Sequence, residues 1–155
     1  MVKAATYEFR NPPLYYALLG TLSGLRHPVA SVYLMRLVSA LINAALITAA
    51  LAAAFQLSRG LLPVLGILTA MTPMFYFLAG SVNPNGVEIA AAICLWASLL
   101  VLFHGPIEPD GRLVARAGLA FLMLVLSRGP GLAFAWAILI LIACASYGLT
   151  GLWEV

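Results

Sequence analysis

Four long stretches of this chain carry no charged residue, and this pattern constrains the fold more than any other feature. They cover residues 37–58, 60–87, 89–107 and 129–153. Each reaches or nearly reaches the roughly 20 residues that a helix needs to cross a hydrocarbon core of about 30 Å. Of the 155 residues, 8% are charged and 64% are hydrophobic. A soluble chain of this length could not bury so much apolar surface, so the sequence predicts an integral membrane protein.

Helices are the expected spanning elements, because backbone groups in lipid have to be hydrogen-bonded within the protein. A membrane β-barrel would need alternating polar and apolar side chains, and runs such as residues 40–55 do not alternate. The predicted fold class is therefore all-α: one polytopic transmembrane helix bundle over residues 1–155, with about five spanning segments. We expect these segments at residues 30–55, 61–80, 87–104, 113–126 and 132–153.

A shorter segment at residues 12–25 holds fourteen residues, too few to span comfortably. We expect an interfacial or re-entrant helix there, with Tyr15 and Tyr16 near the lipid headgroups. Pro73 lies inside the segment 61–80 and should kink it. Residues 81–86 are predicted to form a tight connection, because residues 83–86 are all turn formers. Residues 127–131 predict an interruption between the last two helices.

Three charged residues stand out because charge is unfavourable inside a bilayer. Arg36 lies several residues into the segment 30–55, so it either contacts an anionic group such as a lipid phosphate, snorkels to the interface, or forms a structural ion pair. Glu88 is expected in a first helical turn capped by Asn85, where the helix dipole favours an acid, or at a cavity mouth. Arg128 lies beside two glycines, an arrangement that suits an anion site or a simple interfacial anchor.

Other chemistry is weakly signalled. The net charge is +3, but the basic residues are scattered singly, so no nucleic-acid surface is indicated. Cys94 and Cys144 lie in apolar segments and suggest neither a disulfide nor a metal site. His27 and His104 stand alone in separate loops. No metal-ligand set and no catalytic residue can be assigned from these residues.

Four motifs, taken in order, resemble the C-type, polytopic membrane glycosyltransferase superfamily. Residues 11–16, Asn-Pro-Pro-Leu-Tyr-Tyr, are similar to its His-Pro-Pro-Leu-Tyr-Tyr-like motif, and residues 36–41 resemble the Arg-Leu-Pro-Ser-Ala-Leu start of its next helix. Residues 72–74 and 83–86 resemble the following hairpin. Residues 118–130, which end in Leu-Ser-Arg-Gly-Pro, resemble a short helix ending in Thr-Lys-Gly-Pro. Residues 81–88 look most like an uncharacterised family of predicted bacterial membrane proteins, common in actinobacteria.

The resemblance implies a multi-pass protein of the bacterial plasma membrane. Such enzymes transfer a sugar from a polyprenyl-phosphate donor to a cell-envelope acceptor, and a divalent metal is possible among them. A carboxylate deprotonates the acceptor and basic residues hold the departing phosphate. On this basis the substrate or lipid-phosphate site is expected to gather six residues in one outward cavity: Tyr15, Tyr16, Arg36, Asn83, Glu88 and Arg128.

The chain also departs from the superfamily pattern. The acidic outer loop should precede Asn11, where only Glu8 is found, and Asn11 replaces the motif's histidine. We therefore expect the chain to be part of a longer protein, inactive alone, and to pack against further helices of that chain or another subunit. Two alternatives stay open: a small transporter or channel subunit, favoured by broken helices, and a non-catalytic membrane scaffold.

Overall fold

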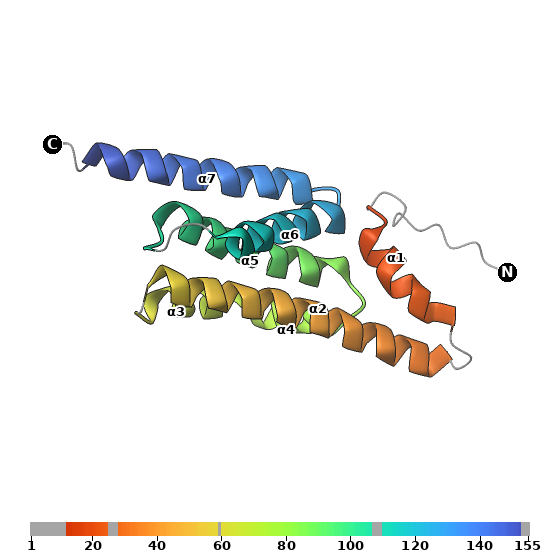
Figure 1. Cartoon of the computed structure of the whole chain (residues 1–155). Helices are drawn as coiled ribbons and strands as arrows, with labels where there is room; N and C mark the ends of the chain where they lie inside the picture. The colour runs from red at the N-terminus through yellow and green to blue at the C-terminus, as the bar shows by residue number, and fades with distance from the viewer. Residues whose placement is uncertain (1–11, 25–27, 59, 107–109, 153–155) are drawn as a thin grey trace.

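The protein is described here by a computed structural model that covers residues 12–24, 28–58, 60–106 and 110–152. Every regular element within these residues is helical, which confirms the all-α prediction. Figure 1 shows seven α-helices and one short 3-10 helix, with these bounds: α1 Leu14–Gly20, η2 Thr21–Gly24, α2 Pro28–Leu57, α3 Leu62–Ala70, α4 Pro73–Ala79, α5 Pro84–His104, α6 Gly111–Ser127 and α7 Gly131–Leu152.

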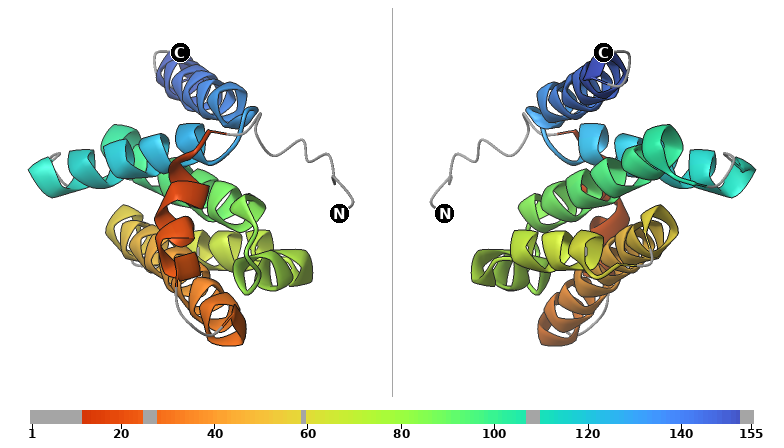
Figure 2. Two further views of the ribbon diagram at one scale, coloured as in Figure 1. Left: turned by 90° about the vertical axis from the view of Figure 1, so that its right-hand side faces the viewer. Right: turned by 90° about the vertical axis from the view of Figure 1, so that its left-hand side faces the viewer.

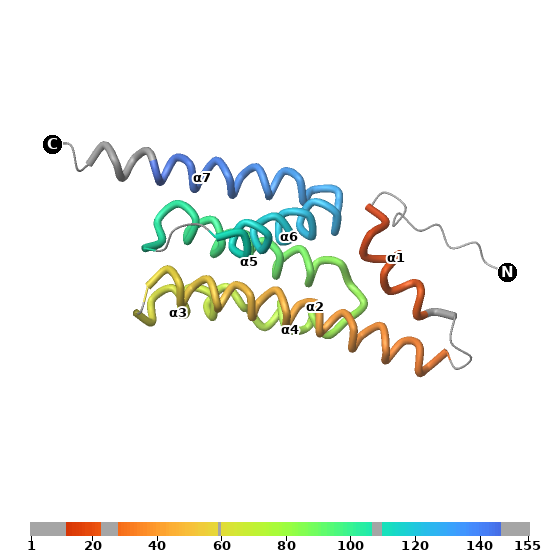
Figure 3. The backbone as a smooth tube through the Cα atoms, viewed as in Figure 1, coloured from red at the N-terminus to blue at the C-terminus, as the bar shows by residue number. Residues whose placement is uncertain are grey.

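The helices lie in three layers. Figures 1 and 2 place α7 on one side, α5 and α6 in the middle, and α2, α3 and α4 on the other side. Helix α5 is central, because it packs against α2, α4, α6 and α7. Helices α2, α5 and α7 all begin at one end of the bundle, where α4 and α6 finish and where α1 lies (Figure 3). We call this the Tyr15 end.

Small side chains allow α2 and α5 to approach closely. Ala50 and Ala53 on α2, and Ala90 and Ala91 on α5, are completely buried. A Cβ added at Gly86 would lie 3.0 Å from the Leu78 carbonyl oxygen, so α4 also meets α5 at backbone level. Such contacts are typical of helices in membranes, where dispersion and close packing replace the hydrophobic effect.

The segment predicted at 61–80 is two helices, α3 and α4, bent by 67°. The expected kink at Pro73 is thus a complete break. Pro73 has no N–H to continue α3, and it occupies the first turn of α4, where that donor is not needed. Thr72 is extended and its hydroxyl accepts a hydrogen bond from the Phe75 N–H at 3.4 Å, which caps α4.

The tight connection predicted at residues 81–86 is wrong in its second half. Residues 80–83 connect α4 to α5, and the Asn83 side chain caps α5 by accepting a hydrogen bond from the Asn85 N–H at 2.9 Å. Pro84 supplies the preorganised first position, so α5 begins three residues earlier than expected. Glu88 consequently lies beyond the first turn, and Asn85 does not cap the helix.

The number of spans shown is smaller than the predicted five. Among the described residues, α2 and α5 are each long and apolar enough to cross a membrane, and the bent pair α3 and α4 could make a third span. Helix α6 has 17 residues and carries Arg112 and Arg116, while the apolar part of α7 covers Gly131–Ser146. By length and composition, the described helices thus show two or three spans.

Candidate functional site at the Tyr15 end

A buried acid is the most unusual group in the bundle. Glu88 is 7% exposed, although it lies among the apolar side chains of α5. Its Oε2 is 3.4 Å from Nη1 of Arg128, and within the described part of the chain its Oε1 has no hydrogen-bond partner. A buried carboxylate normally has its oxygens paired. The free oxygen therefore marks Glu88 as a group with capacity for a further donor.

The α6–α7 link holds Arg128 over this acid. Helix α6 ends at Ser127, and the extended Arg128 is followed by a turn in which the Gly131 N–H donates to the Arg128 carbonyl at 3.1 Å. A Cβ at Gly131 would clash with the Leu124 carbonyl oxygen, so α7 leaves directly against the last turn of α6. The Arg128 side chain is 34% exposed. It thus touches Glu88 with one edge while its other donors remain accessible.

Tyr15 joins three helices at the same end. Its hydroxyl lies 3.0 Å from the Ser39 hydroxyl on α2 and is also hydrogen-bonded to the backbone of Asn83, the cap of α5. Burial raises the pKa of this phenol above its ordinary value of 10.0, and the two hydrogen bonds only partly oppose that shift. The phenol is therefore neutral at physiological pH. Tyr16 packs edge-on against the Tyr15 ring, with centroids 5.5 Å apart.

Replacing Tyr15 by phenylalanine tests this junction. We expect the free energy of unfolding to fall by about 1 to 2 kcal/mol, because the hydrogen bonds of the Tyr15 hydroxyl to Ser39 and to the Asn83 backbone are lost. Tyr33→Phe is the control, since Tyr33 lies on α2 and is 67% exposed. Both variants would be unfolded by SDS titration in mixed micelles. Equal stabilities of the two variants would contradict a structural role for the Tyr15 hydroxyl.

Arg36 has a partner that its sequence position did not suggest. Its Nε donates to the carbonyl of Gly80, the residue that ends α4, at 2.9 Å. The three alternatives for Arg36 were a contact with an anionic group, snorkelling to the interface and a structural ion pair. The contact found is a hydrogen bond from its exposed side chain to a backbone carbonyl at the Tyr15 end. The ion pair in this region is made by Arg128 instead.

The six residues singled out from the sequence therefore gather at one end but in separate contacts. Arg36 contacts the end of α4, Tyr15 contacts α2 and the start of α5, and Arg128 contacts Glu88. Only a few residues, 81–87, separate Gly80 from Glu88 along the chain. Arg36 and Arg128 thus lie at the same end of the bundle, and their role in binding stays a prediction.

Sequence reasoning missed several polar residues. Asn43 is 1% exposed and donates through Nδ2 to the Ser39 carbonyl at 2.8 Å, and its Oδ1 has no partner within the described residues. Nearer the opposite end, Arg116 donates to the Ser98 hydroxyl at 3.1 Å and to Gln56 Oε1 at 2.8 Å. No sequence motif marks these residues. A polar side chain within an otherwise apolar helix is the signal that could have found them.

The described ranges contain no group of three or more His, Cys, Asp or Glu residues placed to hold a metal ion. The nearest approach to such chemistry at the Tyr15 end is the single carboxylate of Glu88. Glu8 and Asn11, which bear on the predicted acidic loop, lie outside the described residues, as does His27.

Comparison with known proteins gives one match. The model of the family described as "Predicted membrane protein (DUF2142)" matches residues 2–150, nearly the whole chain. No curated protein and no solved structure matches the chain. Together with the apolar helices α2 and α5, the extent of the family match supports a single assignment. The chain belongs to the DUF2142 family of predicted membrane proteins.

Proposed function

We propose that this chain is a glycosyltransferase-like membrane protein whose Tyr15 end binds the phosphate of a polyprenyl-phosphate sugar. The sugar would be transferred to a cell-envelope acceptor at the outer face of a bacterial plasma membrane. The observation that carries the proposal is the pairing of half-buried Arg128 with buried Glu88, at the same end as Arg36. With the Tyr15 end at the membrane interface, a lipid phosphate would reach both arginines.

Charge and geometry support the phosphate-binding part of the proposal. The guanidinium of Arg128 has five N–H donors in a planar fork, and Glu88 engages one edge of it. Arg36 donates through Nε to the Gly80 carbonyl, which leaves its two terminal nitrogens for other acceptors. Two such cations favour a leaving phosphate, because they stabilise negative charge as it develops. Glu88 acts as a positioning residue for Arg128.

The proposal includes a multi-pass topology in which α6 and α7 also enter the bilayer. At 1.5 Å per residue, the 17 residues of α6 cover about 26 Å and the 22 residues of α7 about 33 Å. Arg116 lies within α6, where hydrogen bonds to Ser98 and Gln56 satisfy its donors. The five proposed spans would then be α2, the bent pair α3 and α4, α5, α6 and α7. Cysteine accessibility labelling at both bundle ends would test that topology.

Lipid binding gives the direct test. The chain in nanodiscs would be titrated with a polyprenyl phosphate and with the polyprenol of the same length. We expect Arg128→Gln to weaken phosphate binding by about tenfold, corresponding to one charged contact of about 1.4 kcal/mol, with a smaller loss for Arg36→Gln. Arg112→Gln is the matched control, since Arg112 lies at the other end of α6. Equal binding of phosphate and alcohol would refute the proposed site.

A transporter or channel subunit is the second candidate. The broken helices α3 and α4 favour it, since discontinuous helices often form substrate sites in transporters. The buried Asn43, whose Oδ1 has no partner among the described residues, favours it as well. Proteoliposomes distinguish the two functions. Flux of a polar solute through the reconstituted chain, insensitive to Arg128→Gln but lost in Asn43→Leu, would favour transport over phosphate binding.

A further inference from the structure

Glu88 and Arg128 share one contact, and that contact is long for a buried charge. Oε2 lies 3.4 Å from Nη1, whereas charge-assisted hydrogen bonds between a guanidinium and a carboxylate are usually about 2.7–2.9 Å long. The other oxygen, Oε1, is buried, and no donor within the described ranges is bonded to it. The negative charge of Glu88 is therefore compensated by a single cation, through one of its two oxygens.

The other polar groups around the start of α5 have partners of their own. The Tyr15 hydroxyl of α1 is hydrogen-bonded to α2 and to the cap of α5, and Arg36 of α2 donates to the carbonyl that ends α4. Three further tyrosines lie on these helices: Tyr16, Tyr33 and Tyr76. Within the part of the chain that the structure describes, Arg128 is the one cation in an ion pair with Glu88.

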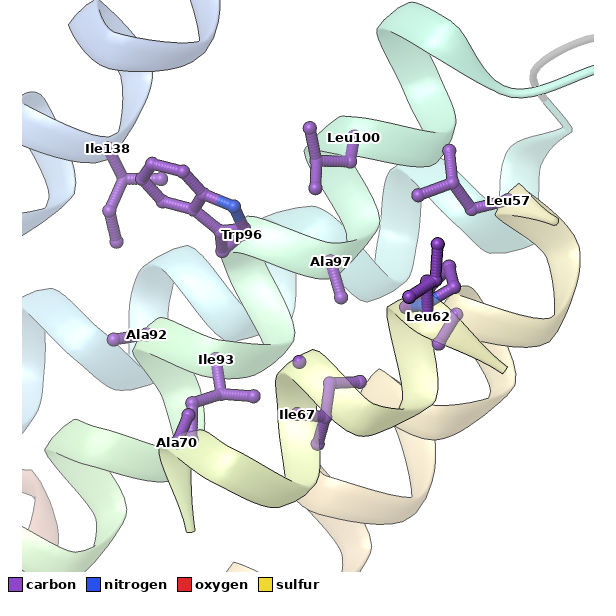
Figure 4. A pocket seen from close by; sticks show the side chains of 13 residues that line it. Leu57, Leu62, Ile67, Ala70, Ala92, Ile93, Trp96, Ala97, Leu100 and Ile138 are labelled. Carbon is purple, nitrogen blue, oxygen red and sulfur yellow. The ribbon is translucent and has the colours of Figure 1, made fainter. Parts of the chain in front are cut away.

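The remaining charged groups of the neighbouring helices lie toward the opposite end. Arg116 of α6 donates to Ser98, which follows Glu88 by about 15 Å along α5. Further along are His104 at the end of α5, and Asp110 and Arg112 at the start of α6; the two thiols are Cys94 and Cys144. The pocket between α2, α3, α5 and α7 is lined by apolar side chains and adds no titratable group (Figure 4). Glu88 is thus the titratable group that a new charge on Arg128 would affect most.

An anion bound to Arg128 would place two negative charges on one guanidinium. Without the anion the pair is neutral, and a phosphodiester would add one net negative charge beside a carboxylate that is 7% exposed. Two acids that share such a site do not both stay ionised, and the weaker acid takes up a proton. A phosphodiester is the stronger acid of the two. We propose that binding of a lipid phosphodiester at Arg128 is coupled to the uptake of one proton by Glu88.

The inference rests on the proposed function, because it takes Arg128 as the phosphate site, and it adds a regulation to that site. The proton comes from the solvent and forms an O–H bond on Glu88, while no covalent bond of the lipid changes. The occupied site then has no net charge. Since the bound state holds one more proton, affinity for the diester falls as the pH rises, by up to about tenfold per pH unit.

Titration calorimetry measures the proton uptake directly. The full chain in nanodiscs would be titrated with the methyl diester of a polyprenyl phosphate, in two buffers of equal pH and different ionisation enthalpy. The diester has one fixed charge, whereas a phosphomonoester would itself titrate near about pH 6. We expect a buffer-dependent heat that corresponds to about one proton per bound lipid, together with the fall in affinity at higher pH.

Two variants assign the proton. Glu88→Gln should abolish the buffer-dependent heat and the pH dependence, while the diester still binds through Arg128. Asp110→Asn is the matched control, because Asp110 caps α6 at the other end of the bundle and an asparagine can accept the same hydrogen bond. It should retain the full uptake. The result for the unsubstituted chain stands without either variant.

The possible failures are distinguishable. Tight binding of the diester with equal heats in both buffers would overturn this inference and leave the phosphate site intact, because Glu88 would then stay charged beside the lipid. Uptake that persists in Glu88→Gln would assign the proton to another group and would overturn it as well. Binding of the diester no tighter than that of the polyprenol of equal length would remove the phosphate site itself, and this inference with it.

Discussion

Replacing Gly131 by alanine is expected to lower the free energy of unfolding by about 3 kcal/mol. The added Cβ would overlap the Leu124 carbonyl oxygen and lie 2.9 Å from the Leu124 carbonyl carbon. These are backbone atoms of α6, so no side-chain rotation relieves the clash. The start of α7 would have to move away from the last turn of α6.

Gly129→Ala is the control for this substitution. Gly129 lies in the same link, a Cβ there meets no atom within 4 Å, and no described glycine has a positive φ. We expect a change within about 0.5 kcal/mol, as for an unremarkable surface position. Unfolding of both variants by SDS titration in mixed micelles measures the difference. Similar stabilities for the two variants would show that α6 and α7 do not meet as closely as described.

The second large effect concerns the buried charge. Arg128→Gln should destabilise the bundle by about 2 kcal/mol, because it leaves the carboxylate of Glu88 buried without a cation. The value lies below the usual penalty for a broken buried pair, since Arg128 is 34% exposed and the contact is 3.4 Å long. Glu88→Gln alone should have a smaller effect, because the removed charge leaves only the accessible arginine unpaired.

A double-mutant cycle isolates this interaction. The variant that combines Glu88→Gln with Arg128→Gln should recover at least half of the stability lost in Arg128→Gln alone. Arg36→Gln serves as the comparison, since Arg36 donates to a neutral carbonyl and leaves no charge behind. Additive losses in the double variant would show that Glu88 and Arg128 are not coupled, and the positioning role given to Glu88 would then fail.

Local chemistry made several features predictable from sequence. Proline ends helices because it lacks an N–H, so the break before Pro73 was expected, although as a kink and not as the 67° bend that separates α3 from α4. The interruption at residues 127–131 was also expected, and α6 ends at Ser127 while α7 begins at Gly131. The resemblance of the four motifs predicted Arg36 and Arg128 in one site, and both lie at the Tyr15 end, in separate contacts.

Contacts between distant segments were not predictable in the same way. The Tyr15 hydroxyl meets Ser39, 24 residues away, and Arg116 meets Gln56, 60 residues away. Neither pair has a local pattern, because each depends on which helix faces are apposed after packing. The start of α5 was misplaced for a related reason: Pro84, Asn85 and Gly86 are turn formers by composition, yet Asn83 caps them into a helix.

The described helices differ in how apolar they are, and this difference also constrains the order in which they can enter a membrane. Among the described helices, α2 and α5 can partition into a bilayer independently as they leave the insertion machinery. Helix α6 carries Arg116, whose hydrogen-bond partners Ser98 and Gln56 belong to α5 and α2. Those partners exist only after both earlier helices have been inserted. Biogenesis is thus expected to proceed in stages, with α2 and α5 providing the membrane-embedded template on which α6 is later accepted.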